Sequence, residues 1–189
     1  MNIETVTVLL EKIFGDAVDS QGPDGWVVQT PRGQLLLLLS EDQSWLRGMV
    51  AIAPIQEAQP YLRELLAANF DDTQETRYAL ADEVLWGVFQ HSFVSLTEGD
   101  LERAIARLIH LGQIGLRDCF SQMTERQIRQ IIWASKKQGQ SLETTMKTLQ
   151  RFYEEGMLGG VEQAKEEREA FLQAWHYQLE RLWHEVEDE

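Results

Sequence analysis

Two hydrophobic periodicities alternate along the chain. Between residues 3 and 14, apolar side chains recur at three- and four-residue steps, which is the spacing of an amphipathic helix. Helical spacing returns over 56–70 and again after Thr97, which forms a capping pattern with Asp100 and opens a helix running to Leu111. The segments between these helices are short, rich in strand-forming residues and bounded by turn residues: 26–30, 34–40, 45–55, 77–83 and 84–93. The pattern therefore predicts helix, three strands, helix, two strands and a further helix.

Five consecutive leucines, Leu35 to Leu39, form the most apolar stretch of the chain. The run is far shorter than the roughly 20 apolar residues of a membrane-spanning helix, and the turn residues on both sides favour a buried strand. In a strand, Leu36 and Leu38 face away from the other three leucines. The segments 45–55 and 84–93 are also apolar at both odd and even positions, so the predicted antiparallel sheet has two apolar faces.

The second apolar face needs a cover, and two interpretations of it remain open. The C-terminal helices could seal it, in which case its tryptophans are core residues. Alternatively, the face docks a partner protein or a second copy of the chain. A partner segment would then lie on the face or add a strand at the edge of the sheet. The side chains expected to form this contact surface are Trp45, Arg47, Met49, Trp86 and Val88.

From Thr124 onward the sequence carries no strand signal. Thr124 opens a second capping box, and Gly139 and the pair Gly159–Gly160 mark joints between helices. Three helices are predicted in this part: 124–140, 141–158 and 160–189. We therefore expect an α+β domain over residues 1–121 and an all-helical C-terminal extension over residues 122–189.

The charge of the chain narrows the range of partners. A net charge of −14 and a pI of about 4.7 argue against nucleic acid and against anionic membrane surfaces, because both attract basic patches. Cys119 is the single cysteine, which excludes an intrachain disulfide and fits a reducing compartment. The N-terminal stretch lacks the pattern of a secretory signal. These features predict a cytoplasmic protein.

Catalytic chemistry leaves no signature in this sequence. The four histidines do not fall into a metal-binding spacing, and no phosphate-binding loop or nucleophile elbow occurs. The carboxylates cluster in predicted turns and on helix faces, where solvation explains them. We therefore expect no catalytic residue, no metal and no cofactor, and we predict that the protein is not an enzyme. A small-molecule enzyme would need a polar pocket that this pattern does not indicate.

One stretch, "AANFDDTQETRYALADEVLWGVFQHSFVSLTEGDLERAIARLIHL", has a recognisable order of residue classes. A helix ending at Asn69 leads to a strand, an acidic turn at Asp82 and Glu83, a long strand, and a Leu-Thr cap before a helix rich in Glu, Arg and Leu. This order resembles the class I type III secretion chaperone family, with its Tir-chaperone-like fold. The chain also looks similar to uncharacterised cyanobacterial proteins of this fold. The resemblance covers about the first 121 residues, and Thr124 to Glu189 has no counterpart in it.

The resemblance implies a small, acidic, dimeric protein that holds an extended segment of another protein. Together with the two-faced sheet, it predicts a non-enzymatic chaperone-like or assembly protein that binds an extended apolar segment of a partner. We expect a homodimer. The alternative is a structural or regulatory homo-oligomer that has no client, with the sheet covered by its own C-terminal helices.

Overall fold

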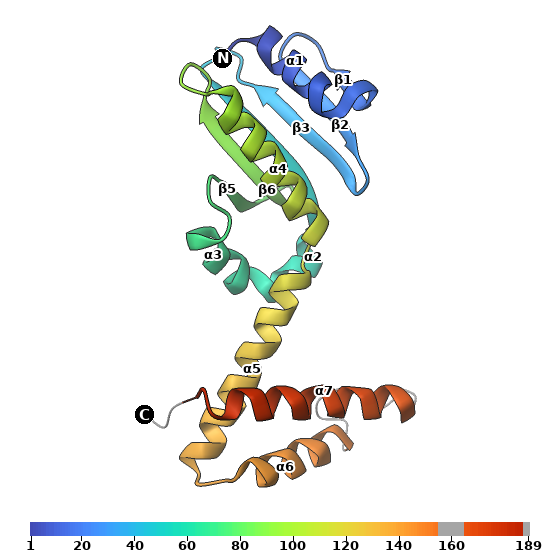
Figure 1. Ribbon diagram of the computed structural model, residues 1–189, viewed down its shortest axis with the longest axis vertical. Coiled ribbons are helices and arrows are strands. Elements are labelled where there is room, and N and C mark those ends of the chain that lie inside the picture. Colours follow the sequence, from blue (N-terminus) through green and yellow to red (C-terminus); the bar gives the residue numbers. More distant parts are fainter. Residues whose placement is uncertain (155–164, 187–189) are drawn as a thin grey trace. The chain divides into compact units, whose positions relative to one another are not determined.

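A six-stranded antiparallel sheet organises the first part of the chain (Figure 1). The computed structural model describes the backbone of residues 1–154 and 165–186 and the side chains of residues 1–151 and 173–186. The chain divides into two compact units, Met1–Phe120 (unit 1) and Ser121–Glu189 (unit 2). The elements of unit 1 are α1 (Ile3–Phe14), η1 (Gly15–Ala17), β1 (Val18–Ser20), β2 (Gly25–Thr30), β3 (Gly33–Leu39), β4 (Trp45–Pro54), α2 (Ile55–Ala58), η2 (Gln59–Tyr61), α3 (Leu62–Asp71), β5 (Thr76–Ala81), β6 (Val84–Ser92) and α4 (Glu98–Ile114). The α+β class and the antiparallel sheet are therefore as predicted.

The first helix, α1, begins and ends at the predicted residues. The Asn2 side chain accepts a hydrogen bond from the backbone N–H of Thr5 at 2.8 Å and caps the first turn. Gly15 has a φ of 57°, a left-handed conformation that terminates the helix. The apolar stripe is buried against the sheet through Val6, Leu9 and Leu10.

Two features of the sheet differ from the prediction or refine it. The short edge strand β1 was not predicted, because Asp19 and Ser20 are exposed and give no alternating pattern. The hairpin between β5 and β6 turns at the acidic pair as expected. Asp82 and Glu83 have φ values of 50° and 60°, the left-handed pair that a two-residue type I′ hairpin turn requires. The spatial order of the strands is β1-β2-β3-β4-β6-β5.

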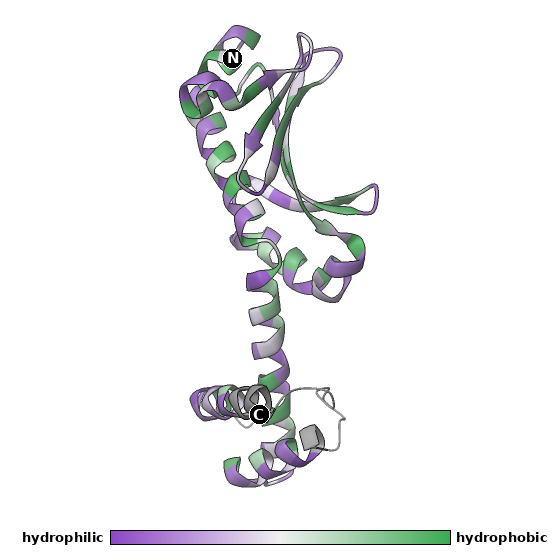
Figure 2. Ribbon diagram, turned by 90° about the vertical axis from the view of Figure 1, so that its right-hand side faces the viewer, coloured by the Kyte–Doolittle hydropathy of each residue, from purple (hydrophilic) through white to green (hydrophobic). Residues whose placement is uncertain are grey.

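One face of the sheet forms the main core of unit 1. In Figures 1 and 2, α1 and α4 lie on the same side of the sheet. Leu35 and Leu37 point to this side and are fully buried. α4 begins with the predicted capping box, in which the Thr97 side chain and the backbone N–H of Asp100 are hydrogen-bonded. Apolar side chains of α1 and α4 seal this face, which we call the core face.

Two glycines let α4 approach the core face closely. A Cβ atom at Gly48 would lie 3.0 Å from Leu108 Cδ1, and one at Gly87 would lie 3.3 Å from Leu111 Cδ1. Gly48 belongs to β4 and Gly87 to β6, two neighbouring strands that α4 crosses. A larger residue at either position would push α4 off the sheet.

The predicted helix over 56–70 is interrupted. It consists of α2, the 3₁₀ turn η2 and α3, and Pro60 lies in the first residues of η2. Proline lacks the N–H that a continuous α-helix would use, so the chain tightens there. A second apolar cluster forms beside this bend, where Leu65, Leu85 and Cys119 are buried together.

Unit 2 is helical, as expected for the C-terminal extension. Its elements are α5 (Arg117–Lys137, which begins in unit 1), α6 (Leu142–Glu154) and α7 (Lys165–Trp183). α5 starts well before Thr124, so the capping box predicted there is wrong: Thr124 lies inside a continuous helix. Gly139, with a φ of 69°, follows the end of α5 as predicted, whereas Gly159–Gly160 lies outside the described residues. The buried core of the unit comprises Ile128, Ile132, Leu149, Leu179 and Leu182.

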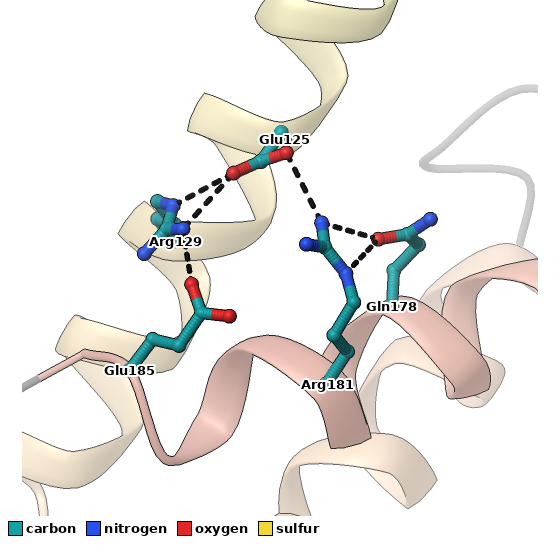
Figure 3. A network of polar contacts seen from close by, with 5 residues as sticks. All are labelled: Glu125, Arg129, Gln178, Arg181 and Glu185. Carbon is teal, nitrogen blue, oxygen red and sulfur yellow. Dashed lines mark hydrogen bonds and ion pairs between the residues drawn. The ribbon is translucent and has the colours of Figure 1, made fainter.

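A network of charged side chains joins α5 to the end of α7 (Figure 3). Glu125 accepts hydrogen bonds from Arg129 at 3.0 Å and from Arg181 at 3.1 Å. Arg129 also donates to Glu185. Arg129, and to a lesser extent Arg181, hold the pKa of Glu125 below its usual value. Both guanidiniums thus have carboxylate partners.

Candidate functional site

The structure describes every residue of unit 1, and no helix of this unit covers the face of the sheet opposite the core face (Figure 2). We call it the open face. The leucine run shows the difference directly, since Leu37 is 0% exposed and its neighbour Leu38 is 42% exposed. Leu36 is half-buried on the same side as Leu38. The prediction that the run divides between two faces is confirmed.

A groove of about 280 Å³ crosses β4, β6 and β5 on the open face. Its walls combine aliphatic, aromatic and charged side chains, contributed by all three strands and by the β5–β6 turn. The residues that line it are Arg47, Met49, Arg77, Ala79, Ala81, Asp82, Trp86, Val88 and Gln90.

Four of the five residues predicted as a contact surface, Arg47, Met49, Trp86 and Val88, line this groove together. The fifth, Trp45, lies next to it on β4, and the Arg47 guanidinium stands over its ring, 4.8 Å from the centroid. The structure therefore brings the predicted residues to one place. Their role in binding stays a prediction.

Sequence reasoning missed the contribution of β5 and of the polar residue on β6. Arg77, Ala79 and Ala81 alternate along β5 and face the groove, and Gln90 follows Val88 on β6. The signal that could have found them is the hairpin register. A two-residue turn at Asp82–Glu83 pairs Arg77 with Val88 and so places both on one face.

The register arranges the groove residues in cross-strand rows. One row joins Met49, Val88 and Arg77, and the next joins Ala51, Trp86 and Ala79. The Trp86 indole N–H donates to the carbonyl of Ala81 at 3.1 Å. This bond holds the indole across the hairpin, where it lines the groove with Ala79, Ala81 and the turn residue Asp82.

The other end of the groove is cationic. Arg47 pairs with Gln90 across β4 and β6, and Arg77 donates from β5 to the Gln90 side-chain oxygen at 3.1 Å. Within the described part of the chain, neither guanidinium forms an ion pair with a carboxylate. We call Arg47, Gln90 and Arg77 the cationic end.

The outer edge of β5 is largely occupied. The Asn69 side chain accepts from the backbone N–H of Tyr78 at 2.7 Å and donates to its carbonyl at 3.1 Å, as a neighbouring strand would. The N–H of Thr76 is bonded to the carbonyl of Thr73 at 3.0 Å. Strand addition at this edge would have to displace these bonds, so the geometry favours the open face over the β5 edge as the binding surface.

A separate apolar surface lies where α3 meets β5. Phe70 is 88% exposed, Leu66 69% and Leu80 49%. A shallow cavity of about 310 Å³ adjoins Leu66 and Leu80. We call these three residues the α3 patch, and exposed apolar groups of this size in one place are typical of contact surfaces.

We next consider the titratable groups of the described residues. Among the described residues, no cluster of three or more His, Cys, Asp or Glu side chains could hold a metal ion. Burial raises the pKa of the Cys119 thiol to about 11, and the negative charges of Glu64 and Asp118 add to this. The thiol is therefore protonated near neutral pH and a poor nucleophile. No described helix combines the length and apolarity needed to cross a bilayer.

No protein-family model and no curated protein matches the chain. The chain is similar to several solved structures. One is the Yersinia pestis type III secretion chaperone SycH in complex with a stable fragment of YscM2, at 13% identity and a TM-score of 0.48 over 60% of this chain and 98% of that one. The ExsC–ExsE complex matches at 17% identity and a TM-score of 0.47, over 62% of this chain and 96% of that one. The HopA1–SchA chaperone–effector complex matches at 10% identity and a TM-score of 0.46, over 61% of this chain and 97% of that one.

Proposed function

We propose that this protein is a non-enzymatic, chaperone-like or assembly protein that holds an extended apolar segment of a partner protein on its open face. The observation that carries the proposal is the groove, in which the half-buried Met49 and Trp86 flank the buried Val88 and form an apolar floor beside the cationic end. Apolar side chains that remain solvent-accessible on a sheet face are stabilised when another chain covers them.

The partner must bury more than one apolar side chain on this face to bind stably. Burying one Leu or Phe side chain contributes about 1.5–3 kcal/mol. Association also costs several kcal/mol in lost translational and rotational freedom, so a single anchor would bind weakly. An extended segment that also covers Leu36 and Leu38 on β3 would supply further apolar contacts on the same face.

The test replaces the groove floor while leaving the core face intact. In a Met49→Asp/Trp86→Asp double variant we expect an unchanged circular dichroism spectrum and loss of the partner that wild type captures in a cross-linking pull-down from the source organism. Val8→Asp/Val94→Asp is the matched control, because it introduces the same two charges at exposed apolar positions that do not line the groove. A double variant that unfolds would identify the groove floor as core, and undiminished capture would also contradict the proposal.

A second candidate function, self-association, is favoured by the α3 patch. Two copies that bury Phe70, Leu66 and Leu80 against each other would cover apolar surface that unit 1 leaves exposed. Sedimentation velocity should then show a dimer that Phe70→Glu dissociates into monomers. A wild-type protein that sediments as a monomer at 100 μM would rule out this interface as a stable one.

A further inference from the structure

We propose that the partner segment carries an acidic side chain, Asp or Glu, whose carboxylate is bound by Arg47 and Arg77 at the cationic end of the groove. This inference rests on the proposed function and specifies the chemistry of the bound segment. It is carried by the placement of the two guanidiniums and by what surrounds them.

The two arginines lie on the strands on either side of Gln90, and both line the groove. Arg47 on β4 is the cross-strand partner of Gln90, and Arg77 on β5 donates to the Gln90 amide oxygen. The two positive groups therefore flank a neutral residue on the central strand β6. An arginine presents several N–H donors in a planar fork that matches a carboxylate, so two arginines that line one end of a groove form a site for an anion.

Several arginines elsewhere in the chain are paired with carboxylates, although Arg32 donates to a backbone carbonyl instead. The sequence has 31 acidic and 17 basic side chains, and the arginines of unit 2 in Figure 3, Arg129 and Arg181, both contact Glu125. Arg103 likewise pairs with Asp100. By contrast, no carboxylate of the described residues pairs with Arg47, which lies over the Trp45 ring, or with Arg77, which donates to Gln90. In an acidic protein, two neighbouring guanidiniums without a carboxylate are complementary to an external one.

The groove also fixes where the acidic side chain lies. Asp82 lines the end near the β5–β6 turn, next to Trp86, and would repel a second carboxylate there. Successive rows along a strand are about 6.6–6.8 Å apart, which is also the distance between residues i and i+2 of an extended peptide. A bound segment that runs along β4 and β6 would thus place an acidic residue at the Gln90 row and apolar residues two and four positions away. The expected pattern is acidic-x-apolar-x-apolar, read in either direction.

A random dodecapeptide display library tests this pattern on the full-length protein. Wild type should enrich peptides with Asp or Glu at least threefold over the starting library, two or four positions from a large apolar residue. An Arg47→Gln/Arg77→Gln variant should keep the apolar preference and lose the acidic one. The single variant Arg77→Gln, at an exposed position, serves if the double variant folds poorly. Arg63→Gln/Arg103→Gln is the matched control, because it removes two exposed positive charges outside the groove.

The best enriched peptide then provides a direct measurement. Replacing its acidic residue by Asn or Gln should weaken binding to wild type about tenfold or more by isothermal titration, and should leave binding to the arginine variant unchanged. Raising the salt concentration should weaken binding of the acidic peptide more than binding of its amide version.

The outcomes separate this inference from the proposed function. Enrichment of apolar residues without acidic ones would overturn the inference and leave the proposed function standing. Acidic enrichment that persists in the arginine variants would show that the carboxylate binds elsewhere and would also overturn it. If wild type enriches no peptide pattern at all, both proposals fail.

Discussion

The core face and the open face are made by the same strands and differ in what lies on them. On the core face, α4 approaches so closely that Gly48 and Gly87 leave no room for a side chain. On the open face the same two strands carry Arg47, Met49 and Trp86, which remain accessible along a groove. A strand sequence that is apolar on both sides needs two covers, and the helices of unit 1 supply one. The difference shows that a short hydrophobic run is a good predictor of a strand, but a poorer predictor of whether both faces of that strand are buried.

The neighbours Leu37 and Leu38 give the sharpest test of this difference, with the largest expected effect. Leu37→Ala should lower the free energy of unfolding of unit 1 by about 2–5 kcal/mol, because it leaves a cavity in the core face. Leu38→Ala removes an exposed side chain and should cost less than about 1 kcal/mol. Urea unfolding, followed by pulsed hydrogen exchange of peptides within Met1–Phe120, measures the unfolding free energy of unit 1 separately from that of unit 2. Equal losses for the two variants would abolish the distinction between the faces.

A second test adds volume instead of removing it. Gly48→Val should destabilise unit 1 by about 1–3 kcal/mol, because its side chain would collide with Leu108 of α4. Ala51→Val adds two methyl groups to the open face of the same strand and should change stability by about 0.5 kcal/mol or less. The same unfolding measurement serves for both variants. A neutral Gly48→Val would mean that α4 does not press on the sheet.

The paired arginines of unit 2 provide a contrast with the cationic end. Glu125→Gln should weaken the packing of α5 on α7 by about 0.2–1 kcal/mol, the range for exposed ion pairs. Because the folded protein lowers the pKa of Glu125, its contribution is present above the unfolded value of about 4.5 and is lost as the pH falls through the folded value. Hydrogen exchange of peptides covering 125–137 and 178–186 should therefore be faster in the variant at pH 7. This difference should shrink below pH 4, and a constant difference would contradict the ion-pair explanation.

The smallest effect is expected where binding is proposed. Arg47→Gln/Arg77→Gln removes two positive charges that have no carboxylate partner among the described residues, so the unfolding free energy of unit 1 should change by about 0.5 kcal/mol or less. Urea unfolding is again the measurement. A loss well above 1 kcal/mol would show that the arginines stabilise the sheet itself.

Local sequence signals were sufficient for much of the fold. The α1 helix was predicted to the residue from its apolar stripe, and the Asn2 cap and the terminating Gly15 of the structure coincide with the ends of that stripe. The strands β2, β3, β4, β5 and β6 were recognised because turn residues bound each run. Signals failed where tertiary context decides: β1 has no apolar pattern, and Thr124 looks like a helix cap although the helix continues through it. A capping side chain acts only where the backbone leaves the helix, and its residue type does not reveal that.

The candidate site was predicted in its apolar part and missed in its polar part. Alternation along β4 and β6 was enough to place Met49, Trp86 and Val88 on one face. Arg77 and Gln90 were overlooked because an exposed Arg or Gln on a strand resembles any solvated residue. Only the pairing of β5 with β6, fixed by the turn at Asp82–Glu83, shows that they meet beside Arg47.

Alternation along β4 also has a consequence for how such a protein can change over generations. Trp45, Arg47 and Met49 point to the open face, and the residues between them, such as Leu46 and Gly48, point to the core face. Mutations at the first set can alter what is recognised while the second set keeps the fold. Selection can therefore act on recognition and on folding through separate, interleaved positions of a single strand, so new specificities can arise in small steps without an unstable intermediate.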